Sequence, residues 1–171
     1  MGLQLPCSVS DLLKNDYRQG VPASLVGKFF APCVRDVQKL HGQGKLHGNI
    51  TTQNIFIDKD LNAKLGDAGI AGKLSEPAYW NKELCAGKPP SVSSDIHALG
   101  VCLYELCMGQ RPFEDEDVEA LKHKIKRGKY EKVPLDGPIP KELAFLTQAL
   151  LEGRCHDVNS ILESPAGKML A

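Results

Sequence analysis

Apolar residues recur at the spacing of an amphipathic helix through residues 24–41. They are Leu25, Phe29, Phe30, Val34, Val37 and Leu40. Pro22 stands just before this segment, where proline favours the start of a helix. Pro32 lies inside it, and because proline lacks the N–H that a helix interior uses, we expect a kink there. The pattern predicts one long helix with a buried face.

Two short apolar runs, 54–57 and 63–65, follow this helix and flank a polar turn. The turn comprises Asp58, Lys59, Asp60, Leu61 and Asn62. Asp and Asn favour turns because their short side chains hydrogen-bond to nearby backbone groups. Short apolar segments on both sides of such a turn predict a β-hairpin.

A second amphipathic helix is predicted where Val118, Leu121 and Ile125 fall on one face. Acidic residues 114–117 precede it and mostly basic residues 122–127 fill its C-terminal half, which is the arrangement that the helix dipole favours. Two interpretations remain open for these charges. They form either a solvated helix surface or a surface on which a partner docks.

Composition narrows the class of protein. The 171 residues suit one domain, and the formal net charge of zero favours neither nucleic acid nor an anionic membrane as a partner. No apolar run is long enough to span a membrane, and residues 1–20 lack the pattern of a secretory signal. The six cysteines contain no C-x-x-C pair and are expected to be reduced, mostly buried thiols. We therefore expect a cytoplasmic or nuclear protein.

The segment 46–58 reads LHGNITTQNIFID, and residues 64–69 read KLGDAG. Protein kinases carry H-R-D-x-x-x-x-N in the catalytic loop and D-F-G after a short hairpin. His47, Asn54, Asp67 and Gly69 match that pattern, whereas Asn49 stands where the catalytic Asp belongs. The chain thus resembles a eukaryotic protein kinase of the serine/threonine type, most similar to the NIMA-related and calcium/calmodulin-like groups.

The resemblance extends over nearly all of residues 1–171, but only to the large, C-terminal lobe of the kinase domain. It assigns 47–54 to a degenerate catalytic loop and 67–83 to the activation segment. It also places the buried central helix of the family at 94–106, with His97 in the usual Trp position. The fold that it implies is mainly α within an α+β family, a helical bundle with a small β-hairpin that carries the catalytic-loop and D-x-G remnants.

The small lobe of a kinase is not found in the sequence. A glycine-rich loop between strands, a V-A-I-K-like lysine and a helix with its partnering Glu are all missing. The glycine cluster at 42–48 follows a helix instead of a strand, so it imitates a phosphate-binding loop only superficially. No cofactor is therefore expected, and Mg and ATP remain only as a residual option.

The residues at the matched positions have different prospects. In the family the catalytic Asp accepts the proton of the substrate hydroxyl, and an amide at Asn49 cannot take that proton. Asn54 and Asp67 match the two metal ligands, and two interpretations are open for them: residual Mg²⁺ binding, or polar side chains that stabilise their turns. Gly48 and Ala68 replace the family's Arg and Phe.

The resemblance implies structural roles for the remaining residues. His47 would brace the loop, and Gly69 completes the D-x-G turn. Asp95 would accept backbone N–H groups of the loop, or else would cap the central helix. Glu83 and Arg154 occupy positions where kinases form a buried ion pair between the activation segment and the last helices, a contact whose loss costs about 3–5 kcal/mol.

These expectations favour a pseudokinase that binds, scaffolds or regulates without efficient phosphoryl transfer. The expected partner is a protein, either an active kinase or a kinase substrate. The alternative is a truncated fragment of a serine/threonine protein kinase that transfers phosphate from ATP to Ser or Thr. A large lobe without its small lobe would also expose apolar surface, which typically marks an interaction site.

Overall fold

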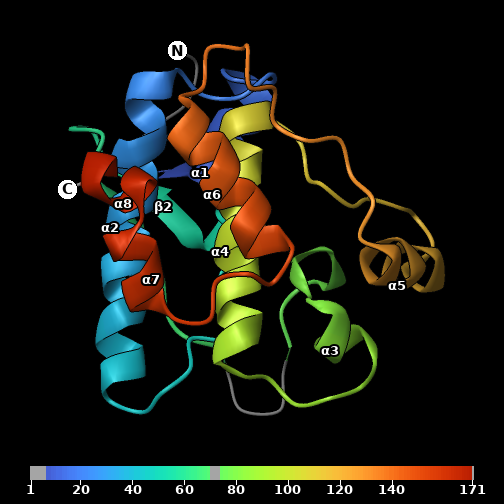
Figure 1. Ribbon diagram of the computed structural model, residues 1–171. Coiled ribbons are helices and arrows are strands. Elements are labelled where there is room, and N and C mark those ends of the chain that lie inside the picture. Colours follow the sequence, from blue (N-terminus) through green and yellow to red (C-terminus); the bar gives the residue numbers. More distant parts are fainter. Residues whose placement is uncertain (1–6, 70–73, 171) are drawn as a thin grey trace.

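The computed structural model describes residues 7–69 and 74–170, which form a helical body with a small sheet on one side (Figure 1). The helices are α1 (Val9–Asn15), α2 (Ala23–Gly42), α3 (Lys82–Cys85), α4 (Val92–Met108), α5 (Val118–Arg127), α6 (Lys141–Leu151), α7 (Val158–Glu163) and α8 (Pro165–Leu170). The 3₁₀ turns are η1 (Thr52–Asn54) and η2 (Pro77–Tyr79), and the strands are β1 (Cys7–Ser8), β2 (Ile55–Ile57) and β3 (Ala63–Leu65). The mainly helical class and the kinase-like C-terminal lobe predicted from the sequence are confirmed.

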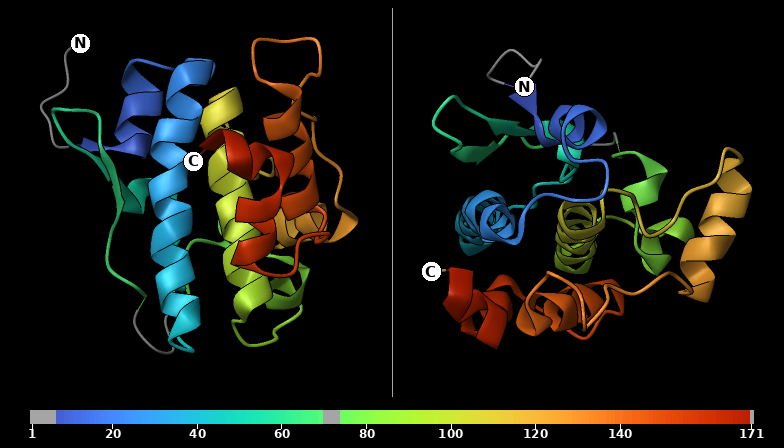
Figure 2. Two further views of the ribbon diagram at one scale, coloured as in Figure 1. Left: turned by 60° about the vertical axis from the view of Figure 1, so that its left-hand side comes forward. Right: turned by 90° about the horizontal axis from the view of Figure 1, so that it is seen from above.

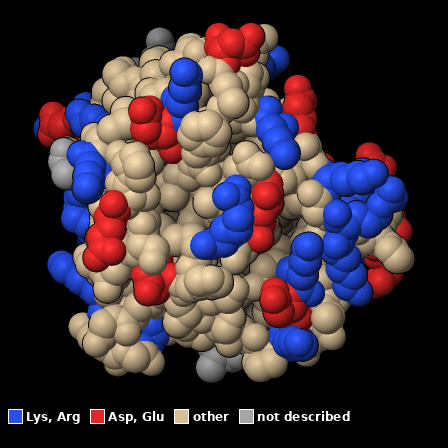
Figure 3. Space-filling view, viewed as in Figure 1, with Lys and Arg blue, Asp and Glu red and all other residues tan. Residues whose placement is uncertain are grey.

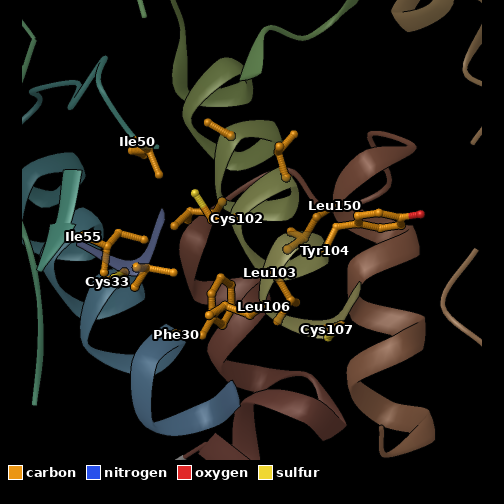
Figure 4. Close-up of a cluster of buried hydrophobic side chains, with 14 of the residues drawn as sticks. Phe30, Cys33, Ile50, Ile55, Cys102, Leu103, Tyr104, Leu106, Cys107 and Leu150 are labelled. Carbon is orange, nitrogen blue, oxygen red and sulfur yellow. The ribbon is translucent and has the colours of Figure 1, made fainter. Parts of the chain in front are cut away.

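Helix α4 is the centre of the molecule and lies between α2 and α6 (Figure 2). Its side chains are buried from Ser94 to Cys107, which explains the almost continuously apolar sequence. Gly100 lets α6 approach closely, because a Cβ there would lie 2.7 Å from Cβ of Leu150. Figure 4 shows the resulting core, in which Phe30 and Cys33 of α2 face Cys102 and Leu106 of α4.

The long helix predicted at 24–41 is observed as α2, one residue longer at each end. Pro32 lies inside this helix without ending it. The face that the apolar pattern marks is buried, with Phe29, Phe30, Val34 and Val37 at most 1% exposed. Helical periodicity over many residues therefore carries the helix past Pro32, and the kink expected there stays a prediction.

The predicted hairpin is also present. Strands β2 and β3 pair antiparallel with Phe56 opposite Lys64, and the Asp58 carboxylate accepts the backbone N–H groups of Asp60 and Asn62, both at 2.9 Å. These contacts hold the turn and place Asn54 at one end of β2. Strand β1 was not predicted; it pairs with β2 and leads into α1 through a capping box of Ser8 and Asp11.

Helix α5 projects beside α3, and Lys and Arg side chains gather over this part of the surface (Figure 3). Asp117 caps its N-terminus and Gly128 its C-terminus. Leu121 and Ile125 are buried as predicted, but Val118 is 47% exposed, so the apolar face is narrower than expected. Among the described helices, none is both long and apolar enough to cross a bilayer.

The cysteines behave as expected. All six are free thiols, and five of them are buried.

Candidate active-site remnant

Asp95 fixes the 47–54 loop to the start of α4. Its Oδ2 accepts the backbone N–H of His47 and the Nε2–H of His41, each at 2.8 Å, and its Oδ1 accepts the N–H of Gly48 at 3.0 Å. Of the two roles considered for Asp95, the structure has the contact with the loop. The helix cap is Ser91, whose hydroxyl accepts the N–H of Ser94.

His47 joins this loop to the D-x-G turn. Its Nδ1 accepts the backbone N–H of Asn49 at 3.1 Å, so Nε2 carries the proton and donates to the carbonyl of Gly66 at 2.8 Å. The N–H of Gly69 returns to the carbonyl of His47 at 2.7 Å. Gly69 also allows a close approach, because a Cβ there would lie 3.0 Å from the carbonyl oxygen of Gly48.

Three candidate side chains meet in one hollow. Asn49, Asn54 and Asp67 line a cavity of about 640 Å³ that opens above the hairpin. Nδ2 of Asn54 donates to the backbone carbonyls of Asn49 and Asp67, both at 3.0 Å. Phe56 extends along the edge of the same cavity and is 44% exposed. The motif spacing therefore corresponds to a real juxtaposition.

The side-chain oxygens of Asn54 and Asp67 at this hollow could serve as ligands of a weakly bound magnesium ion. Nδ2 of Asn54 is engaged, which leaves its Oδ1 as a ligand; this oxygen lies against Gly66, where a Cβ would come within 2.1 Å. Asp67 is exposed and is the one carboxylate among the residues that line the cavity. Mg²⁺ in nucleotide sites typically takes one or two carboxylates and completes its shell with water and phosphate.

The family model described as "Protein kinase domain" matches residues 5–163. The chain belongs to the protein kinase family. Mouse serine/threonine-protein kinase Nek4 is 33% identical over 93% of this chain and 22% of its own length, and human serine/threonine-protein kinase Nek5 is 34% identical over 93% and 25%. Maternal embryonic leucine zipper kinase of Xenopus laevis is 39% identical over 60% of this chain and 18% of its own length. The chain spans a quarter or less of the length of these relatives.

The Nek relatives confirm the predicted similarity to serine/threonine kinases of the NIMA-related group. Of the predicted activation segment of this kinase-family chain, residues 70–73 lie outside the described residues.

The expected buried ion pair between Glu83 and Arg154 is wrong. Glu83 is exposed in the first turn of α3, where the helix dipole accommodates a free carboxylate. The side chain of Arg154 is 58% exposed, and its carboxylate partner is Glu152 at 3.7 Å. Sequence position alone did not distinguish a buried arginine from one at the solvated end of α6.

A different ion pair holds the start of η2 in this kinase-like lobe. Arg111, which follows α4, pairs with Glu76 through both terminal nitrogens of its guanidinium group, Nη1 and Nη2, and Nη2 lies 3.2 Å from Oε2. The same guanidinium lies 5.2 Å from the centre of the Tyr79 ring, within range of a cation–π contact.

Sequence reasoning missed a buried polar cluster beneath the loop. The Glu105 carboxylate accepts hydrogen bonds from the Tyr79 hydroxyl and, at 3.1 Å, from the Thr52 hydroxyl. Burial raises the pKa of Glu105 to about 7, although the two hydroxyl donors and Arg111 act in the opposite direction. The signal in the sequence is a carboxylate within the apolar run 98–108 of α4, which marks a buried charge but does not identify its partners.

Proposed function

We propose that this protein is a kinase-like binding or regulatory protein without efficient phosphoryl transfer. The observation that carries the proposal is Asn49, an amide at the position of the catalytic Asp, in a loop where His47 and Asn54 match the kinase motif and Gly48 replaces its Arg. Its backbone N–H and carbonyl both take part in the bracing contacts of the loop, to His47 and Asn54. A substrate hydroxyl at this position would meet a neutral side chain that can hydrogen-bond to it but cannot accept its proton.

We propose that magnesium binds this protein only weakly. Asn54 and Asp67 are the residues that would hold Mg²⁺, and when bound the ion would neutralise the charge of nucleotide phosphates. The single carboxylate at the cavity supports weak binding at most. Nucleotide and metal are thus proposed as residual ligands and not as working cofactors.

We further propose that residues 1–171 form a kinase-like large lobe, in which 47–54 is the degenerate catalytic loop and 67–83 is the activation segment. A protein partner, an active kinase or a kinase substrate, completes the proposal, with a cytoplasmic or nuclear location. Because binding needs no proton transfer, the wild type and an Asn49→Asp variant are expected to capture the same partner from a cell extract.

The alternative is a slow serine/threonine kinase, and the observation that favours it is the shared cavity of Asn54 and Asp67 in a chain whose relatives are named serine/threonine-protein kinases. Transfer of phosphate from Mg·ATP to Ser/Thr peptides by the full-length protein separates the two. We expect the wild type to equal an Asp67→Asn variant, and Asn49→Asp to stay at that background.

A gain of about 10²–10⁴-fold in Asn49→Asp would establish the alternative, because a positioned general base contributes about that factor in an otherwise competent site. Asn15→Asp is the matched control, since Asn15 is exposed on α1 and lines neither this cavity nor the loop. It adds the same charge without supplying a base.

A further inference from the structure

A second cavity, of about 510 Å³, adjoins the Asn49 hollow and extends from it toward α3 and the start of α4. Gly48, Gly69, Leu74 and Ser75 line both cavities. Its volume lies within the range of about 300–1,000 Å³ that is typical of small-molecule sites. The matched motif residues His47 and Gly69 line it, whereas Asn49, Asn54 and Asp67 line only the neighbouring hollow.

Most of the wall of this cavity is apolar. The apolar side chains come from the loop, the activation segment and both helices: Leu46, Ile50, Leu74, Leu84 and Ala98. Leu46 and Leu74 are 37% and 41% exposed, so apolar surface at the cavity remains in contact with water. Displacing that water by an apolar molecule is favourable in proportion to the area covered.

Small residues keep the cavity open. Gly48 stands where the kinase motif has Arg, and a Cβ built on it would meet no atom within 4 Å. Ala98 contributes only a methyl group on the α4 side.

Nearly all polar groups around the cavity are already engaged. Both oxygens of Asp95 accept hydrogen bonds, and both ring nitrogens of His47 are used within the loop. The hydroxyl of Ser94 donates to the carbonyl of Ser91 and accepts its N–H, both at 2.8 Å. Lys88 differs: it is exposed, and no carboxylate in the described part of the chain pairs with it.

We propose that this cavity binds an amphiphilic organic anion, with an apolar body against Leu46, Ile50 and Leu84 and an anionic head at Lys88. A medium-chain carboxylate has this chemistry. Among the described residues that line the cavity, Lys88 is the cation that no carboxylate pairs with, and its charge favours an anionic head over a cationic one. The apolar wall disfavours neutral polar molecules, which would lose hydrogen bonds to water. The site does not depend on Asn49 or on nucleotide, so it stands or falls separately from the proposed function.

The test is a calorimetric titration of the full-length protein with decanoate, below its micellar concentration, alongside decan-1-ol and acetate. We expect saturable binding of one decanoate, weaker binding of decanol and none of acetate. Lys88→Gln should weaken decanoate binding by about tenfold, the effect of one charged hydrogen-bond partner, and leave decanol unchanged. Lys64→Gln is the matched control, because Lys64 lines the neighbouring cavity but not this one.

The Ala98→Leu substitution on α4 places a larger side chain in the cavity. It should abolish binding of both decanoate and decanol. Because overpacking a buried position can destabilise the fold, methyl NMR of the wild type gives a readout without substitution. Decanoate should shift the methyl resonances of Ile50 and Leu84 and leave those of Ile161, which does not line the cavity, in place. Unsaturable binding, equal effects of Lys88→Gln and Lys64→Gln, or unshifted Ile50 and Leu84 methyls would each overturn the proposal.

Discussion

The Glu105 carboxylate accepts a hydrogen bond from the Thr52 hydroxyl, with 3.1 Å between the two oxygens, and both side chains are buried. This contact joins the middle of α4 to the 3₁₀ turn of the loop, 53 residues away along the chain. The Tyr79 hydroxyl donates to the other oxygen of the same carboxylate, so one acidic group connects the loop, η2 and the central helix.

Stability should fall as pH rises through the titration of Glu105. Burial raises its pKa in the folded state to about 7, from 4.5, so the folded protein binds this proton more tightly than the unfolded chain. The resulting stabilisation is fully present below pH 4.5 and is lost as pH rises through about 7. A shift of this size corresponds to about 3 kcal/mol, to be measured as the free energy of unfolding in urea from pH 4 to 8.

The Glu105→Gln variant should lose this part of the pH dependence, because the amide keeps an acceptor for Thr52 but does not titrate. Glu163→Gln, on the exposed end of α7, is the control and should leave the profile unchanged. Identical profiles for wild type and Glu105→Gln would show that Glu105 keeps an ordinary pKa in the folded protein.

Asp95→Asn should weaken both the fold and the loop. The substitution removes the negative charge that accepts hydrogen bonds from the His41 ring and from the backbone N–H groups of His47 and Gly48. It also replaces one acceptor oxygen by an NH₂ group that faces these donors. Hydrogen bonds to charged groups contribute about 1.5–3 kcal/mol each, so we expect a loss of at least about 2 kcal/mol in urea unfolding.

Hydrogen exchange locates the effect of Asp95→Asn. The amides of His47 and Gly48 should exchange faster in the variant. The exchange rates of amides in the middle of α6 should change only as far as the global stability changes. Asp60→Asn, in the exposed hairpin turn, serves as the control. Unchanged protection at His47 and Gly48 would contradict the assigned role of Asp95.

The elements that the sequence predicts well are those with a periodic or punctuated pattern. Helix α2 follows from apolar residues that recur along its whole length, and the β2–β3 hairpin follows from a turn whose Asp58 binds its own backbone. The grouping of His47, Asn54 and Asp67 was predictable as well, because a motif with fixed spacing on both sides of a hairpin leaves little freedom of placement.

The contacts that the sequence did not predict join segments whose distance is set by tertiary packing. The family resemblance pairs Arg154 with Glu83, yet Arg154 follows the last turn of α6, where the chain faces solvent. Arg111 and Glu76 form the pair that the structure has instead. Choosing among surface charges requires knowledge of which side chains the fold leaves near one another, and neither spacing nor hydropathy supplies it.

His97 should contribute to stability with the opposite pH dependence from Glu105. It is buried in α4, its Nε2 makes no hydrogen bond within the described structure, and burial, followed by the charge of Lys82, lowers its pKa to about 4. The folded protein therefore resists protonation of this ring. Its contribution is fully present above pH 6.5 and is lost as pH falls through about 4, amounting to about 3 kcal/mol.

His97→Phe should remove this acid sensitivity, so the variant should gain stability over the wild type as pH falls from 7 to 4. Urea unfolding of the two proteins at each pH gives the comparison directly, since Glu105 affects both alike. His156→Phe, at an exposed position, is the control. A constant difference between His97→Phe and wild type would mean that His97 titrates normally.

Gly109 ends α4 in a position that only glycine fits. Its φ is +77°, and a Cβ there would lie 2.2 Å from the carbonyl oxygen of Arg18 and 2.6 Å from the N of Gly20. Gly87 provides a matched comparison, because its φ of +86° is similar but a Cβ would meet nothing within 4 Å. Gly87→Ala should cost about 1 kcal/mol, the price of a left-handed backbone for a residue with a side chain.

Gly109→Ala should cost more than Gly87→Ala by about 1–3 kcal/mol, because its methyl group adds a clash with rigid backbone to the same conformational strain. Thermal unfolding of both variants, read as the change in free energy at a common temperature, measures the difference. Equal losses would show that the segment 18–20 moves aside at no cost, and that the close contact between this segment and the end of α4 does not hold α1 against the central helix.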